Sequence, residues 1–125
     1  MMLKARDIMT AEVVTIKGSA TVAEAFEQMS TLCLRALIVE RRYPQDAYGI
    51  VTETDIVYKV TAYGKDPKKI RVYEIMTKPV VSIPSHLNIK YIPRLLNRLH
   101  IRQAPVEENG KYIGMIDFRQ LLFSI

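Results

Sequence analysis

The stretch GIVTETD, residues 49–55, joins a short apolar run to polar side chains that are suited to binding a ligand. Ile50 and Val51 are β-branched and apolar, so they predict a short buried strand. Thr52 ends this strand, and its hydroxyl can accept a hydrogen bond from an unpaired N–H group at the start of the next helix. Asp55 adds a carboxylate, which can accept two hydrogen bonds from a vicinal diol such as that of a ribose. Two interpretations stay open: the pair grips a ligand, or it only caps the helix and complements its dipole.

The composition is that of an ordinary globular domain. The 125 residues are 49% hydrophobic and 25% charged, which allows a sizeable core. No stretch approaches the roughly 20 apolar residues that span a bilayer, and the first residues, MMLKARD, lack an apolar core of secretory length. We therefore expect a cytoplasmic protein without a membrane partner. The formal net charge of +5 favours anionic partners, but the basic residues are dispersed, so nucleic acid binding is only weakly indicated.

The chain contains an internal repeat, offset by 67 residues from Met9 to Met76. The matching segments are DIMT and EIMT, EVVTI and PVVSI, LR and IR, VE and VE, and finally GIV and GMI. Between the last two pairs the first copy carries two extra residues, because nine positions separate Glu40 from Gly49 and seven separate Glu107 from Gly114. A repeat of this length predicts two copies of one structural unit.

The first copy predicts the order strand, helix, strand, strand, helix. The expected strands are residues 13–16, 36–40 and 48–52, and the expected second helix is residues 53–62. Thr21 and Glu24 have the spacing of a capping box at the start of the first helix. Apolar side chains at positions 22, 25, 26, 29 and 32 share one face of that helix. Gly64 is suited to end the second helix.

The second copy departs from the first at Pro93. This proline lies about five residues past a possible cap at Asn88, where only a first helical turn tolerates it freely. We therefore expect a kink or a late helix start. Residues 119–125 leave room for less than two turns of the last helix. A polar linker at residues 65–71 and a helical turn within residues 72–77 precede the second copy, so we divide the chain into repeat 1 (residues 1–67) and repeat 2 (residues 68–125).

Two β-α-β-β-α copies, each opened by an IMT…VV-I phrase and closed by a phrase like GIVTETD, resemble the tandem CBS domain pair, or Bateman module. The resemblance covers residues 3–123. It implies an α+β fold of two repeats packed as a pseudo-twofold module, with two clefts between the repeats. In this family such clefts commonly bind adenine nucleotides or related adenosyl compounds. The resemblance also implies a regulatory sensor that forms homodimers, and not an enzyme.

The resemblance further implies a nucleotide site centred on Thr52 and Asp55, which match the family's ribose-binding pair. By similarity to the regulatory subunit of the AMP-activated kinase, Val81 would lie against the adenine. Basic side chains would face the phosphate. The full set of expected nucleotide contacts is Thr52, Asp55, Ile50, Val51, Val81, Arg35, Arg102 and Arg119.

The positions of Arg35 and Arg102 indicate a special role even without the resemblance. Each stands at the entry to an otherwise apolar strand, where a charge is costly unless it is paired or reaches the mouth of a cleft. The alternative is that the arginines pair with carboxylates such as Glu107 or Asp117. Both interpretations stay open.

The second cleft implied by the resemblance departs from the pattern. Asp117 and Gln120 stand where the first copy has Thr52 and Asp55, and Val14 corresponds to Val81. Gln120 lacks the charge that strengthens a bidentate bond to a diol. We therefore expect one competent site and one impaired or empty site.

The remaining residues offer no catalytic machinery. His86 and His100 have no partner at metal-ligand spacing, so we expect no metal and no catalytic cofactor. Cys33 lies in an apolar run and is predicted to be a small buried residue. Met9 and Met76 are predicted to anchor the segments that precede the strands.

The leading hypothesis is a regulatory module that binds AMP, ADP, ATP or S-adenosylmethionine in one cleft and acts on an unknown regulated protein. The first alternative is a ligand-free dimerisation adaptor. The second is nucleic acid binding through the positive charge, which would weaken steeply with salt.

Overall fold

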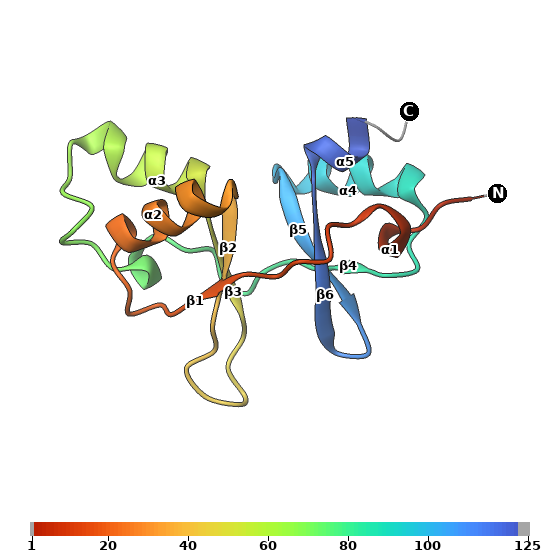
Figure 1. Cartoon of the computed structure of the whole chain (residues 1–125), viewed down its shortest axis with the longest axis horizontal. Helices are drawn as coiled ribbons and strands as arrows, with labels where there is room; N and C mark the ends of the chain where they lie inside the picture. Colours follow the sequence, from red (N-terminus) through yellow and green to blue (C-terminus); the bar gives the residue numbers. More distant parts are fainter. Residues whose placement is uncertain (1, 123–125) are drawn as a thin grey trace. The chain divides into compact units, whose positions relative to one another are not determined.

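The computed structural model describes residues 2–122 (Figure 1). The chain forms two compact units. Residues 14–80 form one, here called the first-repeat unit. Residues 2–13 and 81–122 form the other, the second-repeat unit. The segment that precedes each repeat therefore belongs to the unit of the other repeat.

The first-repeat unit contains a three-stranded sheet of β1 (Thr15–Ile16), β2 (Ala36–Val39) and β3 (Gly49–Thr52), in that order. β1 is parallel to β2, and β3 is antiparallel to it, with Leu37 opposite Val51. The helical elements are α2 (Val22–Leu32), α3 (Glu53–Lys59), η1 (Thr61–Tyr63) and η2 (Val72–Glu74).

The second-repeat unit repeats this topology with β4 (Ile83–Pro84), β5 (Gln103–Glu108) and β6 (Lys111–Asp117). Its helical elements are α1 (Ala5–Ile8), η3 (Ile89–Tyr91), α4 (Ile92–Leu99) and α5 (Phe118–Leu122). The predicted α+β class and the β-α-β-β-α order of each repeat are confirmed. None of the helices within residues 2–122 is long and apolar enough to cross a membrane.

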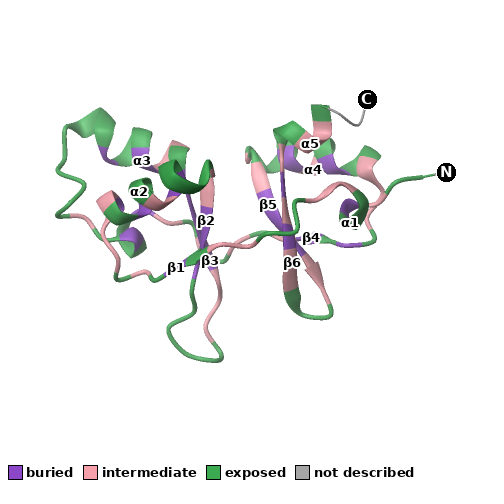
Figure 2. Cartoon of the chain, in the orientation of Figure 1, coloured by how far each residue is buried: buried purple, intermediate pink, exposed green. Residues whose placement is uncertain are grey.

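Each unit has its own core between the sheet and its helices (Figure 2). In the first-repeat unit, Val22, Ala25 and Met29 of α2 pack with strand residues in one buried cluster. Phe26 and Leu32, expected on the same helix face, are 61% and 44% exposed. Phe26 lies about 100° around the helix from Ala25, at the margin of the buried stripe, and Leu32 is the last helical residue. The prediction of a five-residue apolar face was therefore wrong at two positions.

The helix ends follow the local signals closely. Thr21 caps α2 with its hydroxyl, and Glu24 completes the predicted box. Pro93 lies in the first turn of α4, which begins late, after a 3₁₀ turn, as expected. Gly64 is left-handed (φ 62°) and closes η1. Cys33 is exposed at the left-handed end of α2 (φ 55°), so the prediction that it is buried was wrong.

The IMT segments pack beside the β-strands that close the repeats. Thr77 and Ile50 exchange two backbone hydrogen bonds of 2.9 Å in the first-repeat unit. Thr10 and Met115 do the same in the second-repeat unit, at 2.9 and 2.8 Å. A Cβ on Gly114 would lie 2.5 Å from Met9 Sδ and 2.6 Å from the Thr10 carbonyl oxygen. Glycine therefore permits this close approach, and the methionines anchor the segments as predicted.

Candidate functional site

The junction of β3 and α3 holds Thr52 and Asp55 in a reciprocal capping box. The Thr52 hydroxyl accepts a hydrogen bond from the Asp55 N–H group at 3.1 Å. Asp55 Oδ2 accepts from the Thr52 N–H group at 2.9 Å and from the Thr52 hydroxyl at 3.1 Å. The helix-capping interpretation of this pair therefore holds in the structure. It also fixes the orientation of the Asp55 carboxylate.

The other oxygen of Asp55 faces Lys59. Oδ1 lies 3.1 Å from Lys59 Nζ, which also donates to the Ile75 carbonyl at 2.8 Å. A carboxylate offers about four acceptor positions, of which Thr52 fills two and Lys59 one. The Asp55 side chain is 12% exposed. One acceptor position on Oδ1 therefore remains for a ligand, and a second opens when Lys59 moves away.

Arg35 lies at the same end of this sheet. It precedes β2, whose first residue, Ala36, pairs with Thr52. Its carbonyl accepts from the Glu53 N–H group at 2.9 Å, and its exposed guanidinium lies 3.9 Å from the Glu53 carboxylate. The structure thus brings Thr52, Asp55 and Arg35 together, with the Arg35 charge only loosely paired.

The other expected residues of the first-repeat unit have structural roles. Val51 is fully buried in the core, and both backbone groups of Ile50 bond to Thr77. Val14 precedes β1, packs against the same core, and accepts a hydrogen bond from the Ile38 N–H group at 3.0 Å. Among all the expected site residues of the first-repeat unit, only Asp55, Thr52 and Arg35 have side chains suited to a polar ligand.

The junction of β6 and α5 repeats the capping arrangement with different chemistry. The Asp117 N–H group donates to Gln120 Oε1 at 2.7 Å, and Gln120 Nε2 donates to the Thr10 hydroxyl at 2.9 Å. The Asp117 carboxylate accepts from Arg119 Nη2 at 2.7 Å and Nε at 3.0 Å. Arg119, which was expected to face the phosphate, therefore pairs with a carboxylate of its own unit.

The last two expected contacts lie at the same end of the second sheet. Arg102 precedes β5, whose first residue, Gln103, pairs with Asp117. Its guanidinium is exposed and has no ion pair within the described residues. Val81, two residues before β4, is 42% exposed. This set lies in the second-repeat unit, whereas Asp55 and Thr52 lie in the first-repeat unit.

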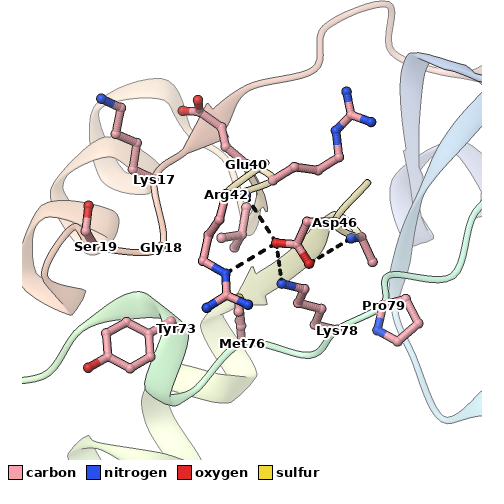
Figure 3. A pocket seen from close by; sticks show the side chains of 13 residues that line it. Lys17, Gly18, Ser19, Glu40, Arg42, Asp46, Tyr73, Met76, Lys78 and Pro79 are labelled. Atoms are coloured by element: carbon pink, nitrogen blue, oxygen red, sulfur yellow. Dashed lines mark hydrogen bonds and ion pairs between the residues drawn. The ribbon is translucent and has the colours of Figure 1, made fainter. Parts of the chain in front are cut away.

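Sequence reasoning missed a pocket of about 990 Å³ at the opposite end of the first sheet (Figure 3). β1 and β2 end there and β3 begins there, so the full length of β3 separates the pocket from Thr52. Its lining residues are Lys17, Gly18, Ser19, Val39, Glu40, Arg41, Arg42, Asp46, Ala47, Tyr73, Met76, Lys78 and Pro79. The available signal was the pair of extra residues in the first copy, next to Arg41 and Arg42.

The family model for the CBS domain matches the chain twice, at residues 5–62 and 72–125. The chain belongs to the CBS domain family. The two matches make it a tandem CBS pair, as the repeat and its motifs indicated.

Two relatives of known sequence share less than a third of their residues with this chain. An uncharacterised protein of Methanopyrus kandleri, MK0525, is 28% identical over 89% of this chain, and the match spans 57% of that protein's length. The CBS domain-containing protein YhcV of Bacillus subtilis is 27% identical over 92% of this chain and 80% of its own.

Solved structures extend the likeness. A hexameric CBS-CP12 protein from bloom-forming cyanobacteria has a TM-score of 0.94 and 54% identity, covering 98% of this chain and 72% of that chain. A signal-transduction protein with CBS domains from Burkholderia ambifaria, described there as putative, has a TM-score of 0.83 and 31% identity, covering 91% and 82%. These likenesses support the fold of a CBS pair.

Proposed function

We propose that this CBS pair is a regulatory module that binds an adenosine-containing nucleotide, AMP, ADP, ATP or S-adenosylmethionine, through Asp55. CBS pairs are generally regulatory and ligand-sensing rather than catalytic. The observation that carries the proposal is the orientation of the Asp55 carboxylate. Thr52 holds one of its oxygens, and the other keeps an acceptor position for a ligand hydroxyl.

The chemistry of this end of the sheet suits a ribose phosphate. One ribose hydroxyl takes the open position on Asp55 Oδ1, and the second replaces Lys59 there. Hydrogen bonds from hydroxyls to an ionised carboxylate are among the strong ones. Arg35, paired with Glu53 only at 3.9 Å, supplies a positive charge for a phosphate.

The proposal includes one competent site per chain. At the corresponding junction of the second repeat, Asp117 is held by Arg119, and Gln120 is bonded to both the Asp117 backbone and Thr10. A diol that approached Gln120 would have to break these bonds for weaker, uncharged ones. This difference between the repeats supports one site instead of two.

Isothermal titration of ligand-stripped protein with the four nucleotides tests the proposal. Asp55→Asn keeps an acceptor for the Thr52 N–H group but removes the charge, so affinity is expected to fall by about 1.5–3 kcal/mol, or roughly ten- to a hundredfold. Glu53→Gln is the matched control, because it removes the same charge from the same helical turn and releases Arg35 from its 3.9 Å pair, so affinity should not fall. Equal binding by Asp55→Asn and the wild type would refute the ribose assignment.

The ligand-free adaptor stays a second candidate, and one observation favours it. The exposed apolar side chains of α2 and α3 in the first-repeat unit include Phe26 (61%), Val57 (49%) and Tyr58 (65%). Such side chains are typical of surfaces that contact another protein. The hexameric CBS-CP12 relative supports a second copy of this chain as that partner.

Self-association is tested by light scattering after size-exclusion chromatography. Phe26→Glu and Tyr58→Glu are expected to reduce the molar mass toward that of one chain, because a buried unpaired charge disfavours the interface. Tyr43→Glu, at a 52% exposed loop tyrosine, is the control that leaves the mass unchanged. An unchanged mass in all three variants would place any interface elsewhere.

A further inference from the structure

The pocket at the other end of the first sheet is organised by one carboxylate. Asp46 Oδ2 accepts from Lys78 Nζ at 2.7 Å, from the Arg42 N–H group at 3.1 Å and from Arg42 Nε at 3.4 Å. Oδ1 accepts from the Ala47 N–H group at 3.0 Å. Figure 3 shows Arg42 and Lys78 turned toward Asp46 from different segments of the chain. Asp46 therefore positions two cations on the wall of the pocket.

This carboxylate keeps its charge. The hydrogen bond from Lys78, followed by that from the Arg42 N–H group, holds the pKa of Asp46 well below its ordinary range, although burial acts in the opposite direction. The side chain is 7% exposed. The charged carboxylate therefore holds Lys78 and the base of the exposed Arg42 side chain in place.

The cations of the pocket retain donors for a ligand. The terminal nitrogens of Arg42 and two N–H groups of Lys78 have no hydrogen-bond partner within residues 2–122, although the Arg42 guanidinium also lies 5.8 Å from the centre of the Tyr43 ring. Arg41 is braced by a 2.8 Å bond from Nη1 to the Pro44 carbonyl and by the Tyr48 ring, 4.8 Å away. With Lys17, the lining carries four cations against the two carboxylates Glu40 and Asp46. A positive surplus in a concave site concentrates anions there.

The second repeat provides an internal comparison. A pocket of about 410 Å³ occupies the matching place there, lined in part by Pro84, Ser85, Glu107, Glu108 and Asn109. At the 67-residue offset, Glu108 and Asn109 replace Arg41 and Arg42, and Pro84 replaces Lys17. The second repeat also lacks the two extra residues of the loop that carries Asp46. The pocket is thus common to both repeats, whereas the surplus of cations belongs to the first copy, because the second pocket has Arg6 against the two carboxylates Glu107 and Glu108.

We propose that this pocket binds a small organic molecule carrying a diphosphate or a comparable pair of negative charges, separately from the Asp55 site. Arginine presents a planar set of N–H donors that matches phosphate oxygens, and lysine adds a point charge. Val39, Met76 and Pro79 form an apolar part of the lining that suits the organic portion of such a ligand. The volume lies within the range of roughly 300–1,000 Å³ of small-molecule sites, which favours a small ligand over a protein partner.

Inorganic diphosphate is the probe, because it lacks the ribose that Asp55 is proposed to bind, and the positions of the amide shifts distinguish the pocket from Arg35. We expect saturable binding by calorimetry, with amide shifts in the NMR spectrum confined to residues 17–19, 40–47 and 73–79. Arg42→Gln is expected to weaken binding roughly tenfold or more. Lys17→Gln, which leaves every Asp46 bond intact, is expected to weaken it less but measurably, so the test survives if Arg42→Gln fails to fold.

Two variants keep this proposal separate from the nucleotide proposal. Asp55→Asn and Arg98→Gln, at an exposed residue of α4 in the second-repeat unit, should both leave diphosphate affinity unchanged. Loss of affinity in Arg98→Gln equal to that in Arg42→Gln would show binding to net charge alone and overturn the pocket. Absence of saturable diphosphate binding in the wild type would overturn it as well, whatever the result with nucleotides.

Discussion

Replacing Gly114 by alanine is expected to destabilise the protein by about 2–4 kcal/mol. The new Cβ would lie 2.5 Å from Met9 Sδ and 2.6 Å from the Thr10 carbonyl oxygen. The methionine can move, but that carbonyl accepts a 2.8 Å hydrogen bond from the Met115 N–H group and cannot retreat without breaking it. Overpacking costs about 1–3 kcal/mol and a lost backbone hydrogen bond about 1 kcal/mol.

Gly49 is the matched control for Gly114, because it holds the same place in the first repeat. Its added Cβ would lie 2.9 Å from Met76 Sδ and 3.1 Å from the Thr77 carbonyl oxygen, which is a milder overlap. Gly49→Ala should therefore cost less, about 1 kcal/mol. Urea unfolding followed by circular dichroism measures both values. Equal costs, or a larger cost for Gly49→Ala, would refute the idea that close approach of the Met9-Thr10 segment requires Gly114.

Two further predictions concern ion pairs. Lys59→Met removes the cation from Asp55 Oδ1. Adenosine, which has no phosphate, should then bind up to about fivefold more tightly by calorimetry, the magnitude expected for a partly exposed ion pair. Weaker binding would contradict the proposed competition between Lys59 and the ribose. Asp46→Asn should lower stability at neutral pH but not in strong acid. The folded pKa of Asp46 is lowered, so its contribution is present above the unfolded pKa of about 3.9 and is lost as the pH falls through the lower folded value. The difference between the urea midpoints of variant and wild type should narrow as the pH falls from about 4 to 2, and a constant difference would argue against the Asp46 ion pairs as its source.

The internal repeat is sufficient to predict most of the fold. Apolar spacing in α2, the Thr21 cap and the position of Pro93 are local signals, and local structure follows them. The packing of each IMT segment into the unit of the other repeat is different, because it depends on contacts between residues far apart in sequence, Thr10 with Met115 and Thr77 with Ile50. Cys33 was wrongly predicted to be buried because its neighbours are apolar. Its backbone adopts the left-handed conformation at the end of α2, and the residue is exposed.

The candidate sites show the same contrast between local signals, which the sequence reveals, and contacts that only folding creates. Thr52 and Asp55 were found because strand, cap and carboxylate are adjacent in sequence. The pairing of Arg119 with Asp117 was not predicted, because carboxylate partners were considered only for Arg35 and Arg102. The cationic pocket was missed, since Lys78 lies 32 positions from Asp46 and only the folded chain joins them. From the sequence, Arg41 and Arg42 were interpreted as part of a dispersed positive surface charge.

Calorimetric titration of the ligand-stripped protein and of Asp55→Asn with AMP, ADP, ATP and S-adenosylmethionine tests the central claim most directly. We expect saturable binding of at least one of these ligands at about one per chain, weakened roughly ten- to a hundredfold in Asp55→Asn and not weakened in Glu53→Gln. Absence of binding by the wild type, or equal binding by all three proteins, would contradict a nucleotide sensor built on Asp55 and favour the adaptor.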